Sequence, residues 1–262
     1  MSNAAEPSST ALLEVKGITK KFGGLVAVND LSFEVGRGKV VSIVGPNGAG
    51  KTTAFNCIAG LYQPDSGTIR FAGEDITGVP SHILAGRGIG RTFQNVRLFN
   101  TLNALENVMV GRTVRGKSGL VDAALCLGRD RSDRRQARER AEELLQWVGA
   151  YEGRLRMPNE LSYGDQRRIE IARALATDPK LLILDEPTAG MIAHEAHHIV
   201  ELMGKLTDAN ITLMLIEHNM NVVMAVSDNI VVLNFGSKIA EGAPAQVRAN
   251  PAVIEAYLGA EA

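Results

Sequence analysis

The stretch GPNGAGKT, residues 45–52, decides the fold of this chain. It fits the pattern G-x-x-x-x-G-K-[ST], follows the apolar run VVSIV (residues 40–44) and precedes the helical stretch TTAFNCIAG. A strand, a glycine-rich loop and a helix in this order form a loop whose backbone N–H groups turn inward around phosphate oxygens. Glycine permits these backbone conformations, and the helix N-terminus adds positive partial charge. The stretch therefore predicts a nucleotide-phosphate site on an α/β scaffold.

The residue types of this loop indicate separate chemical roles. Lys51 is long enough to reach the β- and γ-phosphates, and the hydroxyl of Thr52 is a ligand for Mg²⁺. The loop alone leaves kinases, GTPases, helicases and transporters as alternatives. The nucleotide-binding residues expected here are Gly45, Pro46, Asn47, Gly48, Ala49, Gly50, Lys51, Thr52 and Thr53.

Composition restricts the class of protein. The 262 residues suffice for one or two domains, and the formal net charge of -1 argues against a broad nucleic-acid footprint. The two cysteines, Cys57 and Cys126, form no CxxC pattern, so a buried thiol at Cys57 and a reducing compartment are expected. The polar start MSNAAEPSST lacks the apolar core of a signal peptide, and no apolar run approaches the ~20 residues that cross a bilayer. We therefore expect any work at a membrane to be that of a peripheral partner.

The order of predicted elements indicates a split α/β core. LLEVKGI, FGGLVAV and LSFEV, within residues 12–35, predict an antiparallel sheet. The later strands LLILD, ITLMLIE and NIVVLN alternate with helices near 164–177, 194–206 and 219–226, which predicts a parallel sheet.

Between the two halves of this core, charge density rises. RDRSDRRQARERAEELLQWVGA predicts a helix with an apolar stripe of Leu144, Leu145 and Val148 and a solvated Arg/Glu face. RGKSGLVDAALCLGRDRSD predicts a loop or short helices inserted before it.

The stretch LSYGDQRRIEIARAL, residues 161–175, predicts an amphipathic helix with Ser162 as N-cap and Asp165 completing a capping-box-like pair. By itself this is an ordinary capped helix. Together with the phosphate loop, LSYGDQ resembles the LSGGQ signature of ATP-binding cassette (ABC) ATPases, just upstream of LLILDEP. The resemblance implies that Ser162, Tyr163, Gly164 and Asp165 face a nucleotide held by a second subunit. Tyr163 replaces the first signature glycine, and Asp165 replaces the glutamine.

The same resemblance assigns the catalytic groups. In LLILDEP it implies that Asp185 holds Mg²⁺ together with Thr52, and that Glu186 orients the attacking water. Gln94, in RTFQN, matches the glutamine that reaches both Mg²⁺ and the water, and Lys51 adds transition-state charge stabilisation. His218, in LIEHN, matches the switch histidine at the γ-phosphate.

Two further positions complete the comparison with ABC ATPases. Phe22 matches the aromatic residue that stacks on adenine, although a lone aromatic in a sheet more often belongs to the core. After the carboxylates, AGMIA places Ile192 where the D-loop of these ATPases usually carries a polar residue at the dimer interface. His194, His197 and His198 have helical spacing, but the family gives them no metal role.

Four longer strings narrow the resemblance to ATP-binding subunits of branched-chain amino acid importers: FGGLVAVNDLSFEV, RTFQNVRLFNTLNALENVMVG, LSYGDQRRIEIARAL and NPAVIEAYLG. This implies ATP and Mg²⁺ as cofactors and two such subunits, identical or homologous, on the cytoplasmic face of two membrane permeases. A substrate-binding protein takes part indirectly, and no nucleic acid does. The alternatives are a urea or amide importer, a lipopolysaccharide-export ATPase, a soluble ABC ATPase, and a subunit that no longer hydrolyses ATP.

The resemblance also gives an expected domain organisation, with one ABC ATP-binding domain over residues 11–262. Its expected parts are a RecA-like core with a β-subdomain (11–92 and 166–243), a helical subdomain (93–165), a C-terminal helical tail (244–262) and a disordered N-terminus (1–10).

Overall fold

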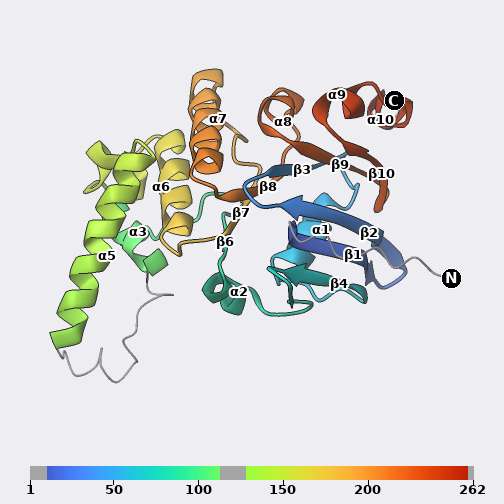
Figure 1. The fold of residues 1–262 in the computed structure, drawn as a ribbon. Helices are drawn as coiled ribbons and strands as arrows, with labels where there is room; N and C mark the ends of the chain where they lie inside the picture. Colours follow the sequence, from blue (N-terminus) through green and yellow to red (C-terminus); the bar gives the residue numbers. More distant parts are fainter. Residues whose placement is uncertain (1–10, 113–127, 259–262) are drawn as a thin grey trace. The chain divides into compact units, whose positions relative to one another are not determined.

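The chain divides into two compact units in the computed structural model, which describes residues 11–112 and 128–258 (Figure 1). Unit 1 comprises residues 1–80 and 206–262, and unit 2 comprises residues 81–205. The predictions for residues 1–10, for Cys126 and for most of the inserted stretch before residue 128 fall outside the described residues.

The first sheet of unit 1 is antiparallel, as the sequence predicts, with strand order β2-β1-β4-β5. Its strands are β1 (Ala11–Phe22), β2 (Leu25–Gly36), β4 (Ser66–Phe71) and β5 (Glu74–Asp75). The three short strands expected before residue 36 are in fact two longer ones, because the chain turns at Gly23. The φ of this residue is 56°, which glycine adopts readily. FGGLVAV therefore contains the hairpin turn and is not one strand.

The second sheet of unit 1 is mostly parallel and carries the phosphate loop. Its order is β10-β9-β3-β8, with β3 parallel to both neighbours and β10 antiparallel to β9. The strands β3 (Val40–Val44) and β8 (Thr212–Ile216) are buried throughout, as expected of strands covered on both faces. The other two strands are β9 (Asn229–Asn234) and β10 (Ser237–Gly242).

Helices cover both faces of this sheet. On one side α1 (Lys51–Ile58) contacts β2 and β8, one strand from each sheet of the unit. Figure 1 shows α8 (Met220–Val226), α9 (Pro244–Arg248) and α10 (Pro251–Leu258) on the other side. The expected buried thiol is confirmed: Cys57 of α1 is buried, and burial raises the pKa of its thiol to about 11.

Unit 2 combines a parallel strand pair with a group of helices. The strands are β6 (Ile89–Arg91) and β7 (Leu181–Asp185). The helices are α2 (Ser81–Arg87), α3 (Ala104–Arg112), α5 (Gly128–Trp147), α6 (Tyr163–Leu175) and α7 (Ala193–Asp208), at whose end the division from unit 1 falls. Helices α3, α5 and α6 pack on one another, and the predicted stripe of Leu144, Leu145 and Val148 is buried there.

The observed elements confirm the predicted α/β class, with an antiparallel sheet near the start and a mostly parallel second sheet. The helices expected near 164–177, 194–206 and 219–226 are α6, α7 and α8. Shorter elements, such as β6, α2 and β10, were not predicted, because three to seven residues are too few to show a clear hydrophobic period.

Helix α3 approaches α6 closely at a glycine, within the helical group of unit 2. A Cβ atom added to Gly111 would lie 2.1 Å from the backbone carbonyl oxygen of Arg173. Gly204, in α7, has open space around the same position.

Gly111→Ala is expected to lower the free energy of unfolding by about 1–3 kcal/mol, because the two helix backbones must separate to admit a methyl group. Gly204→Ala is the matched control and is expected to raise it by about 0.5–1 kcal/mol, since alanine favours an exposed helix. Urea unfolding followed by circular dichroism measures both changes. Equal effects of the two substitutions would contradict the close contact.

Candidate nucleotide-binding site

The phosphate loop of unit 1 requires glycine at two positions. Gly45 has φ 151°, and a Cβ atom there would lie 2.1 Å from the carbonyl oxygen of Leu233. Gly50 has φ 94°, and a Cβ atom there would lie 2.2 Å from the carbonyl oxygen of Ala27. The loop is therefore pressed against neighbouring backbone, and Gly50 is also the N-cap of α1. A side chain at either position would therefore displace the loop.

Lys51 lies across this loop. Its Nζ donates hydrogen bonds to the carbonyl oxygens of Gly45 at 2.7 Å and Pro46 at 2.8 Å. Asn47, Gly48 and Thr52 are exposed, so the crest of the loop and the predicted Mg²⁺-binding hydroxyl face solvent. A concave loop with a cation held across it and a helix N-terminus behind it fits a polyphosphate.

Two other predicted residues of unit 1 are exposed. Phe22 is 44% exposed at the end of β1, with the Tyr62 ring edge-on at a centroid distance of 5.4 Å. His218 is exposed two residues after the end of β8, and its backbone N–H donates to the buried carboxylate of Glu217 at 3.2 Å. Glu217 also accepts from the N–H of Asn219 at 3.3 Å, so it fixes the turn that presents His218. Glu217 was not predicted from the sequence.

Tyr257 of α10 is a second residue that was not predicted from the sequence. It packs on the buried cluster that contains Val44, the last residue of β3 before the phosphate loop. Burial raises the pKa of the Tyr257 hydroxyl, and a hydrogen bond with the backbone of Gly45 opposes that rise. The C-terminal helix thus supports the first glycine of the loop.

In unit 2 the structure brings together two residues that are 92 positions apart in sequence. Gln94 Nε2 donates a hydrogen bond to Glu186 Oε2 at 3.2 Å. Gln94 follows β6 and Glu186 follows β7, and these strands are parallel neighbours, so both side chains leave the same edge. Glu186 holds φ at 44°, a costly conformation for a non-glycine residue that often marks functional positions.

Asp185 is 3% exposed and sits at the end of β7. Burial raises the pKa of its carboxyl to about 6; the Arg91 guanidinium, 3.8 Å away, opposes this, and Glu186 adds to it. Its backbone N–H donates to the Thr92 hydroxyl at 3.4 Å. A buried carboxylate that is costly to ionise is well suited to a divalent cation, whose charge would offset that cost. Arg91 and Thr92 were not predicted.

The signature stretch caps α6 as predicted at Ser162, whose Oγ accepts from the Asp165 N–H at 3.1 Å. The other half of the expected capping box is different: the Asp165 carboxylate accepts from the Ser162 hydroxyl at 2.9 Å, not from the Ser162 backbone N–H. Asp is one methylene shorter than the Glu of a capping box, which favours the nearer group. Ser162 and Tyr163 are exposed and Asp165 is half-buried, while Gly164 is buried against the side chain of Glu195.

The residues after the carboxylates present an apolar side chain to solvent, since Ile192 is 68% exposed. Nearby, His194 and His198 stack edge to face at a ring distance of 4.2 Å, and His197 lies 3.4 Å from Glu201. Ile192 therefore lies exposed immediately before α7.

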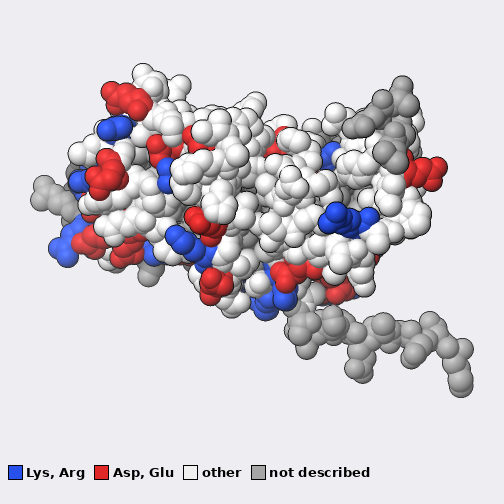
Figure 2. All heavy atoms as spheres, turned by 90° about the horizontal axis from the view of Figure 1, so that it is seen from above, with Lys and Arg blue, Asp and Glu red and all other residues white. Residues whose placement is uncertain are grey.

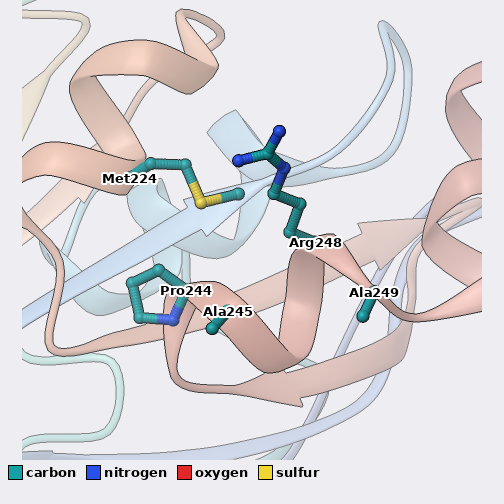
Figure 3. Close-up of a pocket in the computed structure, with 5 residues that line it drawn as sticks. All are labelled: Met224, Pro244, Ala245, Arg248 and Ala249. Atoms are coloured by element: carbon teal, nitrogen blue, oxygen red, sulfur yellow. The ribbon is translucent and has the colours of Figure 1, made fainter.

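The described part of the chain also has a pocket and a surface of mixed charge. A cavity of about 510 Å³ in unit 1 is lined by Met224, Pro244, Ala245, Arg248 and Ala249, none of them a predicted site residue, and Figure 3 shows Met224 and Arg248 extending toward the same space. Basic and acidic side chains are interspersed on the face drawn in Figure 2. Among the described residues, no helix combines the length and apolar character of a membrane span.

The phosphate loop, the buried aspartate and the glutamine–glutamate pair define a nucleotide-binding protein of the P-loop class. Two family models match the sequence: "ABC transporter" over residues 28–189, more than half of the chain, and "Branched-chain amino acid ATP-binding cassette transporter" over residues 237–262. The high-affinity branched-chain amino acid transport ATP-binding protein BraF of Pseudomonas aeruginosa is 47% identical over 96% of this chain and 99% of its own length.

Solved structures of ATP-binding cassettes resemble this chain as well. The ADP conformation of the ATP-binding cassette MJ1267 superposes with a TM-score of 0.83 at 32% identity, covering 95% of this chain and 99% of the other. The dimeric ABC transporter cassette MJ0796 has a TM-score of 0.75 at 28% identity, covering 88% and 98%. The chain therefore belongs to the ABC transporter family.

The pKa of Asp185 yields a prediction about the ligand-free protein. The folded-state pKa of about 6 exceeds the ordinary 3.8, so the stability contributed by the protonated form is lost as the pH rises through 6. Asp185→Asn removes this dependence, and the variant is expected to gain about 1–2 kcal/mol in unfolding free energy relative to the unsubstituted protein between pH 5 and pH 8.

Urea unfolding at the two pH values, without nucleotide or Mg²⁺, measures the change. Asp75→Asn is the control, because hydrogen bonds from Thr77 lower the pKa of the exposed Asp75, and its effect is expected to stay constant over this range. A difference between Asp185→Asn and the unsubstituted protein that does not change with pH would refute the raised pKa of Asp185.

Proposed function

We propose that this chain is the ATP-hydrolysing subunit of an importer for branched-chain amino acids. The observation that carries hydrolysis is the contact of Gln94 with Glu186 beside the buried Asp185. The support for the substrate is the name of BraF together with the family model that matches residues 237–262.

The proposed chemistry follows from the groups that each residue offers. The N–H groups of the phosphate loop bind the β- and γ-phosphates, and Lys51 exchanges its two loop carbonyls for phosphate oxygens. Hydroxyl, amide and carboxylate oxygens from Thr52, Gln94 and Asp185 are suitable ligands for Mg²⁺, which would neutralise phosphate charge. Thr52 belongs to unit 1 and Asp185 to unit 2, so their meeting at one ion is part of the proposal.

Glu186 is the proposed base. Its carboxylate accepts a hydrogen bond from the attacking water and orients it in line with the γ-phosphorus, while Gln94 holds the same carboxylate and water. His218, at the exposed turn after β8, contacts the γ-phosphate, and Phe22 stacks on the adenine. Electrostatic stabilisation by Lys51 and the loop N–H groups supplies most of the acceleration.

A second ATP-binding subunit is proposed to complete each site with its residues Ser162, Tyr163, Gly164 and Asp165. The dimeric structure of MJ0796 supports this arrangement, and the exposed Ile192 fits a position that a partner covers. Two membrane permeases are the proposed partners on the inner face of the cell membrane. Closure of the dimer on ATP would change their state, and hydrolysis would reset it.

Glu186→Gln is expected to abolish most ATP turnover while leaving ATP binding intact, because the amide cannot accept a proton or orient the water as the carboxylate does. The ATP-bound protein should then accumulate as a dimer, which size-exclusion chromatography with light scattering detects. Glu201→Gln, on an exposed turn of α7, is the control and should keep normal turnover. Normal turnover in Glu186→Gln would disprove the assigned base.

Deletion of the gene is expected to reduce uptake of leucine, isoleucine and valine, and the unsubstituted chain should restore it. Glu186→Gln, which folds but does not reset the permeases, should fail to restore it. Radiolabelled uptake measures the effect, with urea uptake in the same strains as the comparison. Unchanged uptake of all three amino acids would disprove the substrate assignment without affecting the ATPase assignment.

A further inference from the structure

The loop that carries Gln94 is held by two charged side chains that have almost no exposed surface. Arg167 is 0% exposed and Glu170 is 1% exposed, and they lie one turn apart on α6. Arg167 Nη1 donates to the carbonyl oxygen of Phe93 at 2.6 Å and to Glu170 Oε2 at 2.8 Å. Its Nη2 donates to the carbonyl oxygen of Gln94 at 2.7 Å. Both carbonyls thus receive charge-assisted bonds from one rigid fork.

Glu170 holds the same segment through its N–H groups. Its Oε1 accepts from the backbone N–H of Phe93 and of Arg97, each at 3.3 Å. Burial raises the pKa of the Glu170 carboxyl, and the Arg167 charge together with these N–H groups opposes the rise. Four backbone groups over residues 93–97 are therefore fixed from α6, with Gln94 among them.

Fold stability alone is a weak reason for this arrangement. Removing two opposite charges from water is costly, and well-packed apolar side chains often serve a fold as well or better. Among the described residues, Arg167 Nε is also buried without a hydrogen-bond partner, so the guanidinium is oriented for its Nη contacts at the expense of Nε. What the pair supplies is a defined geometry for one loop.

The same guanidinium reaches the signature stretch. Arg167 Nη2 also donates to the Tyr163 hydroxyl at 3.3 Å, and the charge lies over the Tyr163 ring at 5.9 Å. Tyr163 is the first residue of α6, next to the N-cap Ser162. One buried side chain therefore joins the start of the signature helix to the backbone of Gln94.

We propose that Arg167 and Glu170 are positioning residues for Gln94, which fix its amide against Glu186 and make the Gln94 loop move together with the start of α6. This inference rests on the proposed ATPase function. The Gln94–Glu186 contact is 3.2 Å, so a displacement of about 1 Å breaks it, and a displacement of that size is enough to cost ~100-fold in rate.

The first test needs no nucleotide. Arg167→Met combined with Glu170→Gln removes both charges of the pair at once, so neither remains as a lone buried ion. Arg173, whose side chain is 14% exposed, loses its 3.8 Å contact with Glu170 in this variant. Hydrogen exchange of the Phe93 and Arg97 amides is expected to accelerate by about tenfold or more in this variant, since a neutral amide oxygen replaces their carboxylate acceptor and the guanidinium fork is gone. Arg138→Met with Glu142→Gln, an exposed pair on α5 with a 3.0 Å contact, is the matched control and should leave these amides unchanged.

The second test is a kinetic cycle with Gln94→Ala. The double variant Arg167→Met with Glu170→Gln (the charge-free variant) and Gln94→Ala are each expected to lower kcat by roughly 10- to 100-fold. Because the pair acts through Gln94, the combined variant should be no slower than the slower of the two. Multiplied losses would overturn the proposal, as would an unchanged kcat in the charge-free variant. Absence of ATPase activity in the unsubstituted protein would instead refute the proposed function.

Arg167→Lys separates positioning from folding. Lysine keeps a positive charge beside Glu170, but a single ammonium lacks the planar fork that serves both carbonyls. The variant is expected to keep its Tm within a few degrees while kcat stays about tenfold low, and this comparison also serves if the charge-free variant does not fold. Full recovery of kcat in Arg167→Lys would overturn the proposal.

Discussion

Parallel strand pairing is the constraint on which the candidate site depends. Two parallel neighbours end at the same edge of a sheet, so the residues that follow them are brought together however far apart they are in sequence. In unit 1, Ile43 pairs with Ile216, and the phosphate loop and His218 follow these two strands. In unit 2, Arg91 pairs with Ile183, and Gln94 and Glu186 follow. The buried strands thus select which polar residues meet.

The polar residues at these strand ends are held by buried charges and backbone groups, not by one another alone. Lys51 lies on two carbonyls of its own loop, Glu217 fixes the turn of His218, and Arg167 fixes the loop of Gln94. Each arrangement removes charge from water, which costs free energy unless the partners are well placed. Such costs at the strand ends of each unit are characteristic of preorganised sites.

Much of the fold was predictable because its strands are continuous apolar runs. VVSIV, LLILD and NIVVLN were each placed correctly, and the antiparallel start and the helix over residues 163–175 were also expected. The turn at Gly23 was not, because a pair of glycines within a β-rich stretch does not indicate on which side of them a strand ends. The individual site residues came from their resemblance to ABC ATPases. The contact of Gln94 with Glu186 depends on the pairing of β6 with β7, and it was not predictable because β6 has only three residues.

The buried pair on α6 shows a different limit of sequence reasoning. RRIE, residues 167–170, has the composition of a solvated helix face, and charged residues are almost never fully buried without a partner. Arg167 is buried, whereas Arg168 bonds Asp165 near the surface. Amphipathic periodicity cannot distinguish the two, because the backbone acceptors of Arg167 lie on a loop more than 70 residues earlier in the chain. Only the packing of that loop on α6 makes the distinction. In the proposed dimer this packing also gives the two nucleotide sites a direct mechanical connection, because the signature helix faces one nucleotide and the Gln94 loop bonded to it faces the other.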